Sequence, residues 1–71
     1  MERTEITSSN IRSVGYDPDT LVLEIEFVAG PIYQCKGVPA YIFDDMFVAK
    51  SAGTYFAVAV KNKYPYERVK E

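Results

Sequence analysis

The stretch LVLEIEFV, residues Leu21–Val28, alternates apolar side chains with two glutamates. A period of two places successive side chains on opposite faces of a strand, so one face of this segment is uniformly apolar and the other carries the charges. The pattern therefore predicts a half-buried β-strand. Its buried face would consist of Leu21, Leu23, Ile25 and Phe27.

The segment before this strand predicts a turn and an earlier strand. Asp17–Thr20 (DPDT) combines a proline that presets φ with aspartates that can accept hydrogen bonds from nearby backbone. A four-residue turn there makes Ile11–Tyr16 the preceding strand and places Val14 and Tyr16 on the core face. Gly15 in that strand indicates either a β-bulge or the close approach of another backbone segment.

The loop at residues 29–31 sets which face of the following segment, IYQCKGV, is buried. A hairpin loop with an odd number of residues points Tyr33 and Cys35 toward the core, whereas an even loop points Gln34 and Lys36 there. Burial of those polar side chains without partners is costly, and the glycine in the loop supplies the positive φ that a three-residue loop needs. We therefore predict an odd loop.

With this register, the opposite face of the sheet is predicted to be half apolar. Such a composition favours an interaction surface, because exposed apolar patches commonly mark sites where proteins associate. This face would carry Ile11, Val22, Val28 and Ile32 among Glu24, Glu26, Gln34 and Lys36.

Two segments with helical features follow. Pro39 suits a first helical turn, and the run AYIFDDMFVAK at residues 40–50 has apolar side chains at helical spacing. Residues 51–53 (SAG) are expected to end that helix. The run TYFAVAVKNK at residues 54–63 fits both a strand and a helix, and we favour a helix ended by Pro65. The final YERVK is expected to be an extended tail.

These elements predict an α+β fold, a small three-stranded antiparallel meander packed against one or two carboxyl-terminal helices. A chain of 71 residues is expected to form a single domain over residues 1–71, because it buries only about 60% of its unfolded surface. A single cysteine, no signal-peptide pattern and no apolar run long enough for a bilayer favour a soluble cytoplasmic protein without a membrane partner.

Charge is distributed unevenly along the chain. Residues 1–49 carry eight acidic and three basic side chains, whereas residues 50–71 carry five basic and two acidic ones. Cations interleaved with aromatic rings are typical of single-strand nucleic-acid sites, where bases stack on the rings. The candidate nucleic-acid-binding residues are Lys50, Lys61, Lys63, Tyr64, Tyr66 and Arg68.

The sequence gives little support for a catalytic function. The chain has no histidine, which is the commonest proton-transfer side chain, and its only thiol, Cys35, is predicted to be a core residue. Asp44 and Asp45 are consecutive, so they would lie about 100° apart on a helix and would not converge. The turn DPDT lacks the glycine and distal glutamate of a calcium loop. We expect no enzyme activity, cofactor, metal or small-molecule substrate.

Four stretches together resemble the KTSC domain family. They are SSNIRSVGYDPDTLVLEIEF from Ser8, GPIYQCKGVP from Gly30, SAGTYF from Ser51 and YPYERV from Tyr64. The family takes its name from the carboxyl end of some lysyl-tRNA synthetases and also occurs as stand-alone bacterial proteins. The resemblance suggests RNA binding. The motif positions that it marks are Tyr33, Cys35, Tyr55 and Phe56.

Three positions depart from the pattern that this resemblance implies. Cys35 stands where the second tyrosine of a Tyr-x-Tyr motif is expected, Ala57 where Asn is frequent, and Lys61 where Arg is expected. Lysine keeps the charge but lacks the planar fork that binds phosphate through two hydrogen bonds. If these positions carry a shared activity, the departures weaken or redirect it.

Two functions fit the sequence. In the first, the domain is a non-catalytic RNA-binding module whose carboxyl-terminal lysines and arginine contact phosphates while the tyrosines stack on bases; a purely structural role for that segment, closing the fold, is the competing interpretation. In the second, the domain is a protein-protein interaction or self-association module that uses the half-apolar sheet face or an edge strand to bind a partner or its own copy.

Overall fold

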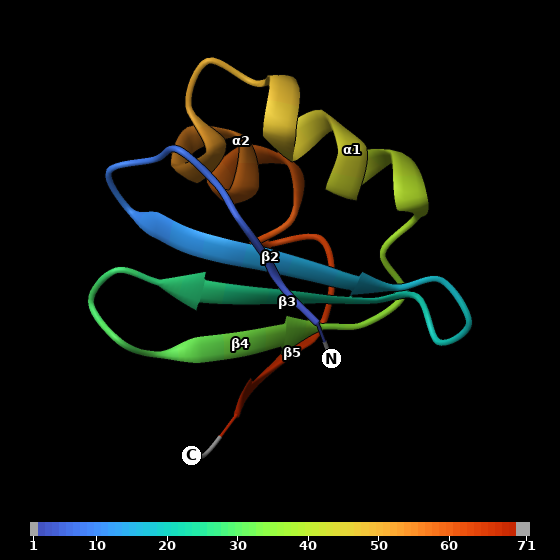
Figure 1. Cartoon of the computed structure of the whole chain (residues 1–71). Coiled ribbons are helices and arrows are strands. Elements are labelled where there is room, and N and C mark those ends of the chain that lie inside the picture. The colour runs from blue at the N-terminus through green and yellow to red at the C-terminus, as the bar shows by residue number, and fades with distance from the viewer. Residues whose placement is uncertain (1, 70–71) are drawn as a thin grey trace.

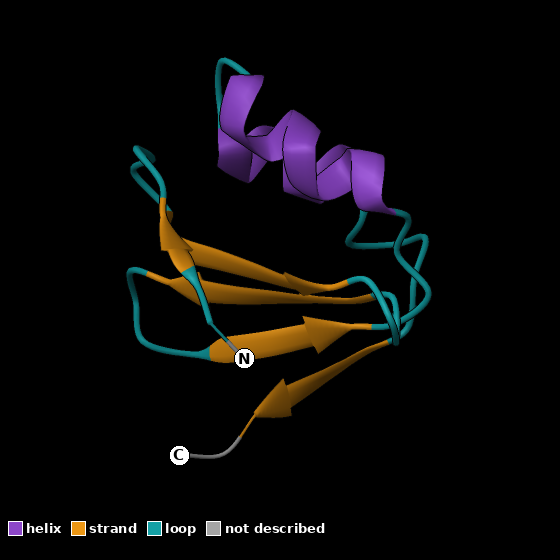
Figure 2. Cartoon of the chain, turned by 45° about the vertical axis from the view of Figure 1, so that its right-hand side comes forward, coloured by secondary structure: helices purple, strands orange, loops and turns teal. Residues whose placement is uncertain are grey.

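The computed structural model describes residues 2–69, and within them one antiparallel sheet carries two helices on one of its faces (Figure 1, Figure 2). The five strands lie in the order in which they occur in the chain, and both helices are inserted between the last two. The elements are β1 Thr4–Glu5, β2 Ile11–Asp17, β3 Val22–Phe27, β4 Ile32–Cys35, α1 Ala40–Val48, α2 Ala52–Ala59 and β5 Tyr66–Val69.

The α+β class is confirmed, but the predicted number of strands is wrong. The expected three-stranded meander corresponds to β2, β3 and β4, and a short strand is added at each edge. β1 was missed because two residues carry no alternating pattern. Residues 66–69 form β5 on β4 rather than a tail, and Lys70 of the predicted tail lies outside the described residues.

The hairpin between β3 and β4 has the odd loop that the sequence predicts. The Phe27 N–H donates a hydrogen bond to the carbonyl oxygen of Pro31 at 3.0 Å, and Gly30 adopts φ 120°. Ile25 is therefore opposite Tyr33, and Leu23 is opposite Cys35. Because opposite residues in a sheet share a face, Tyr33 and Cys35 point to the helix side.

The turn between β2 and β3 lies one residue later than predicted. Asp17 pairs with Val22, so the turn occupies residues 18–21, and the Asp19 N–H donates to Asp17 Oδ1 at 3.0 Å. Leu21, expected on the buried face, is instead in this turn with φ 58° and is 44% exposed. A four-residue turn preserves the predicted faces, and Val14 and Tyr16 lie on the helix side as expected.

A β-bulge changes the face of Ile11. Ile11 pairs with Phe27 and Ser13 with Glu26, so β2 advances two residues where β3 advances one. The extra residue turns Ile11 to the helix side, where it is fully buried. Its predicted place on the opposite face is wrong, because strict alternation does not survive a bulge.

The ambiguous segment after residue 53 is helical, as favoured, but its start was misplaced. α1 already ends at Val48, and residues 51–53 begin α2 instead. Ser51 is the N-cap of α2, and its side chain accepts a hydrogen bond from the Thr54 N–H at 3.3 Å. α2 ends at Ala59, before Pro65, in a turn closed by backbone hydrogen bonds. Pro39 is the N-cap of α1.

The core lies between the helices and the helix-facing side of the sheet. The Tyr16 hydroxyl donates to the carbonyl oxygen of Val38 at the edge of this core. Among residues 2–69, no helix has both the length and the apolar content that crossing a bilayer requires. The buried cluster consists of Ile11, Val14, Leu23, Ile25, Cys35, Val38, Ile42, Met46, Ala52, Phe56 and Val60.

Candidate functional site

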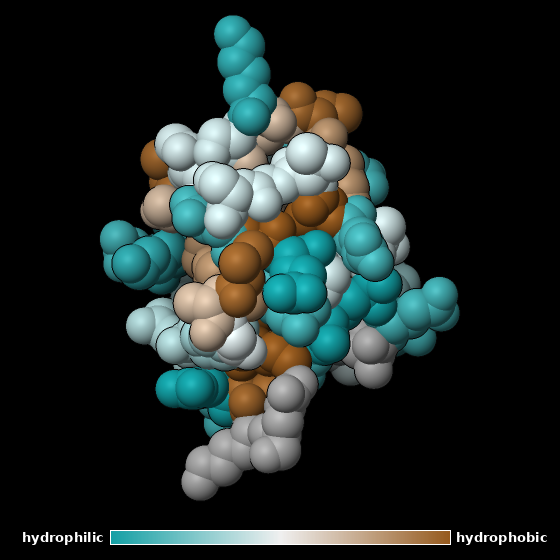
Figure 3. Space-filling view, turned by 60° about the vertical axis from the view of Figure 1, so that its left-hand side comes forward, coloured by the Kyte–Doolittle hydropathy of each residue, from teal (hydrophilic) through white to brown (hydrophobic). Residues whose placement is uncertain are grey.

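An open groove of about 780 Å³ lies where α2 meets the β3–β4 hairpin and β5. The helices leave this end of the sheet partly uncovered, so side chains that face the helix layer are reachable there. In Figure 3 the side of the molecule with the hairpin loop is turned forward, and apolar surface borders hydrophilic side chains. The lining residues are Ser9, Asn10, Phe27, Val28, Ala29, Pro31, Tyr33, Gly53, Phe56, Ala57, Lys61 and Tyr66.

Four aromatic rings form a continuous row through the groove. Successive ring centroids are separated by 5.6 Å from Tyr66 to Tyr33, 5.8 Å from Tyr33 to Phe27, and 5.6 Å from Phe27 to Phe56, all edge to face. Such pairs contribute about 0.5–1.5 kcal/mol beyond area burial. Phe56 anchors one end at 8% exposure, while Tyr66 at the other end is 55% exposed. The row is therefore buried at the Phe56 end and exposed to solvent at the Tyr66 end.

Two cations lie beside these rings. Lys61 follows α2 in a turn where its N–H donates to the Phe56 carbonyl oxygen at 3.0 Å, and it lines the groove. Arg68 is directly opposite Tyr33 in the β4–β5 pairing, so its side chain leaves the sheet on the groove side. Both side chains are exposed, and within residues 2–69 neither forms an ion pair.

The polar edge of the groove comes from the loop before β2. Ser8 Oγ accepts hydrogen bonds from the N–H groups of Asn10 and Ile11 at 3.2 and 3.3 Å, and the Asn10 carbonyl oxygen accepts one from Val28 at 2.9 Å. A Cβ at Gly53 would lie 3.0 Å from Asn10 Nδ2. The absence of a side chain there lets the amide of Asn10 approach the first turn of α2.

The structure brings together some of the predicted site residues and separates others. Lys61, Tyr66, Tyr33 and Phe56 line the groove, and Arg68 adjoins it. Lys50 and Lys63 are exposed but do not line it, and Tyr64 is half-buried against the core. Phe27 and Asn10 were missed because the sequence assigns one to a strand core and the other to a loop, and only the register places them side by side.

The remaining motif positions, Cys35 and Tyr55, are structural in this arrangement. Cys35 is 1% exposed, and burial raises the pKa of its thiol to about 11, so it stays protonated near neutral pH. Burial, with the neighbouring Asp45, also raises the pKa of Tyr55, whose hydroxyl donates to Asp45 Oδ2 at 3.2 Å. Within the described residues, no three His, Cys, Asp or Glu side chains are grouped to hold a metal ion.

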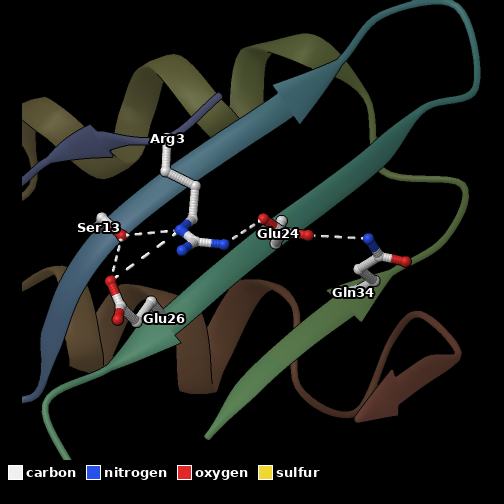
Figure 4. A network of polar contacts seen from close by, with 5 residues as sticks. All are labelled: Arg3, Ser13, Glu24, Glu26 and Gln34. Carbon is white, nitrogen blue, oxygen red and sulfur yellow. Dashed lines mark hydrogen bonds and ion pairs between the residues drawn. The ribbon is translucent and has the colours of Figure 1, made fainter. Parts of the chain in front are cut away.

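The sheet face opposite the helices is polar, which corrects the prediction of a half-apolar surface. Figure 4 shows Arg3 reaching across β2 to Glu24 on β3, with which it forms an ion pair. Gln34 Nε2 donates to the other oxygen of Glu24 at 2.8 Å, and Ser13 Oγ donates to Glu26 at 2.8 Å. Each of these side chains already has a partner within the domain.

Two of the four apolar residues predicted for this face lie on it and two do not. Ile11 faces the helices, and Val28 lies in the loop that lines the groove. Ile32, opposite Glu26 in the β3–β4 pairing, is on this face as predicted but is only 3% exposed. Val22 is half-buried. Among residues 2–69, this face therefore lacks the contiguous apolar patch on which the self-association hypothesis was based.

The fold and groove define a small α+β domain with an aromatic surface depression at one end of its sheet. Residues 7–64 match the KTSC domain. The crystal structure of a KTSC domain protein from Yersinia pestis superposes with a TM-score of 0.90 at 37% identity, covering 97% of each chain. The chain belongs to the KTSC domain family.

Proteins of two kinds are similar to this chain in sequence, a small protein of about the same length and a large ligase. An uncharacterized protein of Stutzerimonas stutzeri (strain A1501) is 37% identical over 70 residues, which is 97% of this chain and 99% of that protein. A lysine–tRNA ligase of Nostoc sp. (strain PCC 7120) is 34% identical over 61 residues, which is 86% of this chain but 11% of the ligase. The domain thus resembles both a stand-alone protein and a segment of a much larger enzyme.

Two of the three departures from the family pattern fall in the groove. Ala57 and Lys61 both line it, whereas Cys35 lies in the core. Relative to asparagine and arginine, these side chains remove an amide and a planar donor fork from the groove wall. The groove of this chain is consequently more apolar and offers fewer hydrogen bonds than the expected pattern would.

Proposed function

We propose that this domain is a non-catalytic RNA-binding module and that the aromatic groove is its contact surface. The observation that carries the proposal is the pairing of an exposed ring, Tyr66, with the cations Lys61 and Arg68 at one apolar depression. A base stacked on an aromatic side chain contributes about 1–3 kcal/mol, and lysine and arginine neutralise the adjoining phosphates.

The relatives support the same proposal from another direction. The lysine–tRNA ligases of Nostoc sp. and Nostoc punctiforme contain a segment that is 34% and 33% identical to this chain over 61 residues. Their names state that they act on a transfer RNA. An RNA-contacting surface on this segment is consistent with its presence in such an enzyme, and this chain would keep that surface.

Titration of the ¹⁵N-labelled domain with single-stranded RNA, followed by NMR, tests the proposal. We expect shifts confined to the groove, and Tyr66→Ala to weaken binding about 10-fold because one stacking contact is lost. Lys61→Ala should also weaken binding. Lys63→Ala is the matched control, since Lys63 lies in the same turn but outside the groove.

Two results would contradict the proposal. One is the absence of binding to any RNA at low salt by a domain whose spectrum shows that it is folded. The other is an equal loss of affinity in the Lys61 and Lys63 variants, because that pattern indicates attraction by net charge and not contact in the groove.

A further inference from the structure

We infer that the groove holds a short, single-stranded segment of RNA, about two or three nucleotides long, through two phosphate contacts and one main stacking contact. This inference rests on the proposed function and specifies the ligand of the same site. It follows from the number of rings and cations that the structure makes available at the groove.

The aromatic row offers one well-exposed stacking ring. Phe56 is 8% exposed, and Phe27 and Tyr33 are half-buried with their edges engaged by neighbouring rings. Tyr66, at 55% exposure and at the end of the row, is the ring whose surface is free for a base. A second base can fill the groove beside Tyr33 but cannot stack on an equally open ring.

The cations beside the row number two in residues 50–69. Lys61 lines the groove and Arg68 is opposite Tyr33, whereas Lys50 and Lys63 do not line it. Of the three cations before residue 50, Arg3 is paired with Glu24, Lys36 is paired with Glu67, and Arg12 does not line the groove. Two phosphates are therefore contacted within the described residues, compared with the four suggested by the composition of the carboxyl-terminal segment.

The shape and polarity of the groove favour unpaired bases. A groove of about 780 Å³ lined mainly by apolar side chains is filled by base planes. An A-form duplex presents phosphates and 2′-hydroxyls and keeps its bases stacked inside, so it would leave this apolar lining in contact with water. Ser9 and Asn10 at the rim supply the polar groups available to base edges.

The salt dependence of binding measures the number of phosphate contacts. For single strands the slope of log affinity against log salt is about −0.7 per phosphate, so two contacts predict a loss of about 7-fold in affinity between about 50 and 200 mM salt. Four contacts would give a loss of about 50-fold over the same range. Lys61→Ala and Arg68→Ala should each reduce the slope by about 0.7, while Lys63→Ala leaves it unchanged.

Oligonucleotide length provides the second measurement. Oligouridylates from the dinucleotide to the dodecanucleotide should bind with an affinity per site that stops rising at the trinucleotide, and a blunt RNA duplex should bind at least about 10-fold more weakly. Binding with a four-phosphate slope, rising affinity beyond the hexanucleotide, or equal affinity for the duplex overturns this inference while the proposed function stands. Failure of every RNA to bind overturns the proposed function itself.

Discussion

The two ends of the helix-facing side of the sheet are built from the same strands but differ in what covers them. Tyr33 and Cys35 are two residues apart on β4 and point the same way. Cys35 belongs to the buried cluster with Leu23 and Met46, whereas Tyr33 lines the open groove. A ring and a thiol with the same orientation thus have different environments.

Tyr33 and Cys35 show that, in a domain of this size, the direction of a side chain does not by itself decide how exposed it is. The helices are short, nine residues in α1 and eight in α2, and they cover one end of the sheet more completely than the other. The covered end holds the fold together. The uncovered end leaves aromatic side chains available for binding.

Truncation of one side chain at each end tests this contrast most strongly. Leu23→Ala should lower the free energy of unfolding by about 3 kcal/mol, because it leaves a cavity beneath fully buried neighbours. Tyr66→Ala should lower it by less than about 1 kcal/mol, because more than half of the ring is already in water. Urea unfolding of both variants gives the comparison. Similar losses in the two variants would mean that the groove rings are needed for folding.

Alkaline pH should destabilise the covered end. The pKa of Cys35 rises on folding from 9.0 to about 11, so the stability it contributes is present below pH 9.0 and is lost as the pH rises toward about 11. A rise of this size corresponds to about 2 to 3 kcal/mol. Between pH 9.0 and about 11, the free energy of unfolding should therefore fall less in Cys35→Ala than in the wild-type protein. Denaturant unfolding at several pH values measures this difference.

Part of the alkaline loss should remain in that variant. Burial also raises the pKa values of Tyr16 and Tyr55, and these hydroxyls too are protonated more strongly in the folded state. An identical pH dependence in the wild-type and Cys35→Ala proteins would show that the thiol is not held in the closed environment that the structure gives it.

Two glycine substitutions, both with smaller expected effects than Leu23→Ala, sharpen the comparison. A Cβ at Gly15 would lie 2.6 Å from the backbone oxygen of Glu2, so Gly15→Ala should displace the segment that carries Arg3 and cost about 1 to 2 kcal/mol. At Gly53 the nearest atom is the end of the Asn10 side chain, 3.0 Å away, which can move aside.

Gly53→Ala should therefore change stability by no more than about 0.5 kcal/mol, with any gain coming from the higher helix propensity of alanine. Thermal unfolding of the two alanine variants measures the difference between them. A larger loss at Gly53 than at Gly15 would indicate that the groove edge is packed as tightly as the covered part of the domain.

Much of the central sheet could be predicted from local pattern. The alternation in LVLEIEFV identified β3, and the unfavourable burial of Gln34 and Lys36 selected the odd loop that points Tyr33 inward. Local pattern failed at the bulge, where one extra residue in β2 reversed the face of Ile11. No particular set of residues marks a β-bulge in a sequence, so the alternating pattern alone could not locate it.

The candidate site was only partly predictable. Lys61, Tyr66 and Arg68 were selected by composition, but their neighbours across the groove come from other elements. The missing information was the pairing of β5 with β4 after both helices have intervened. Only that pairing brings the ring of Tyr66 next to the ring of Tyr33.

The sequence by itself determined the three central strands and the first helix, the inward direction of Tyr33 and Cys35, and the presence of cations near aromatic residues at the carboxyl end. These properties depend on side-chain periodicity, turn geometry and composition over a few neighbouring residues. Only the tertiary structure decided that β5 joins the sheet and that one end of that sheet stays open. Both depend on contacts between segments distant in the chain, and local preferences carry no information about which distant surfaces meet.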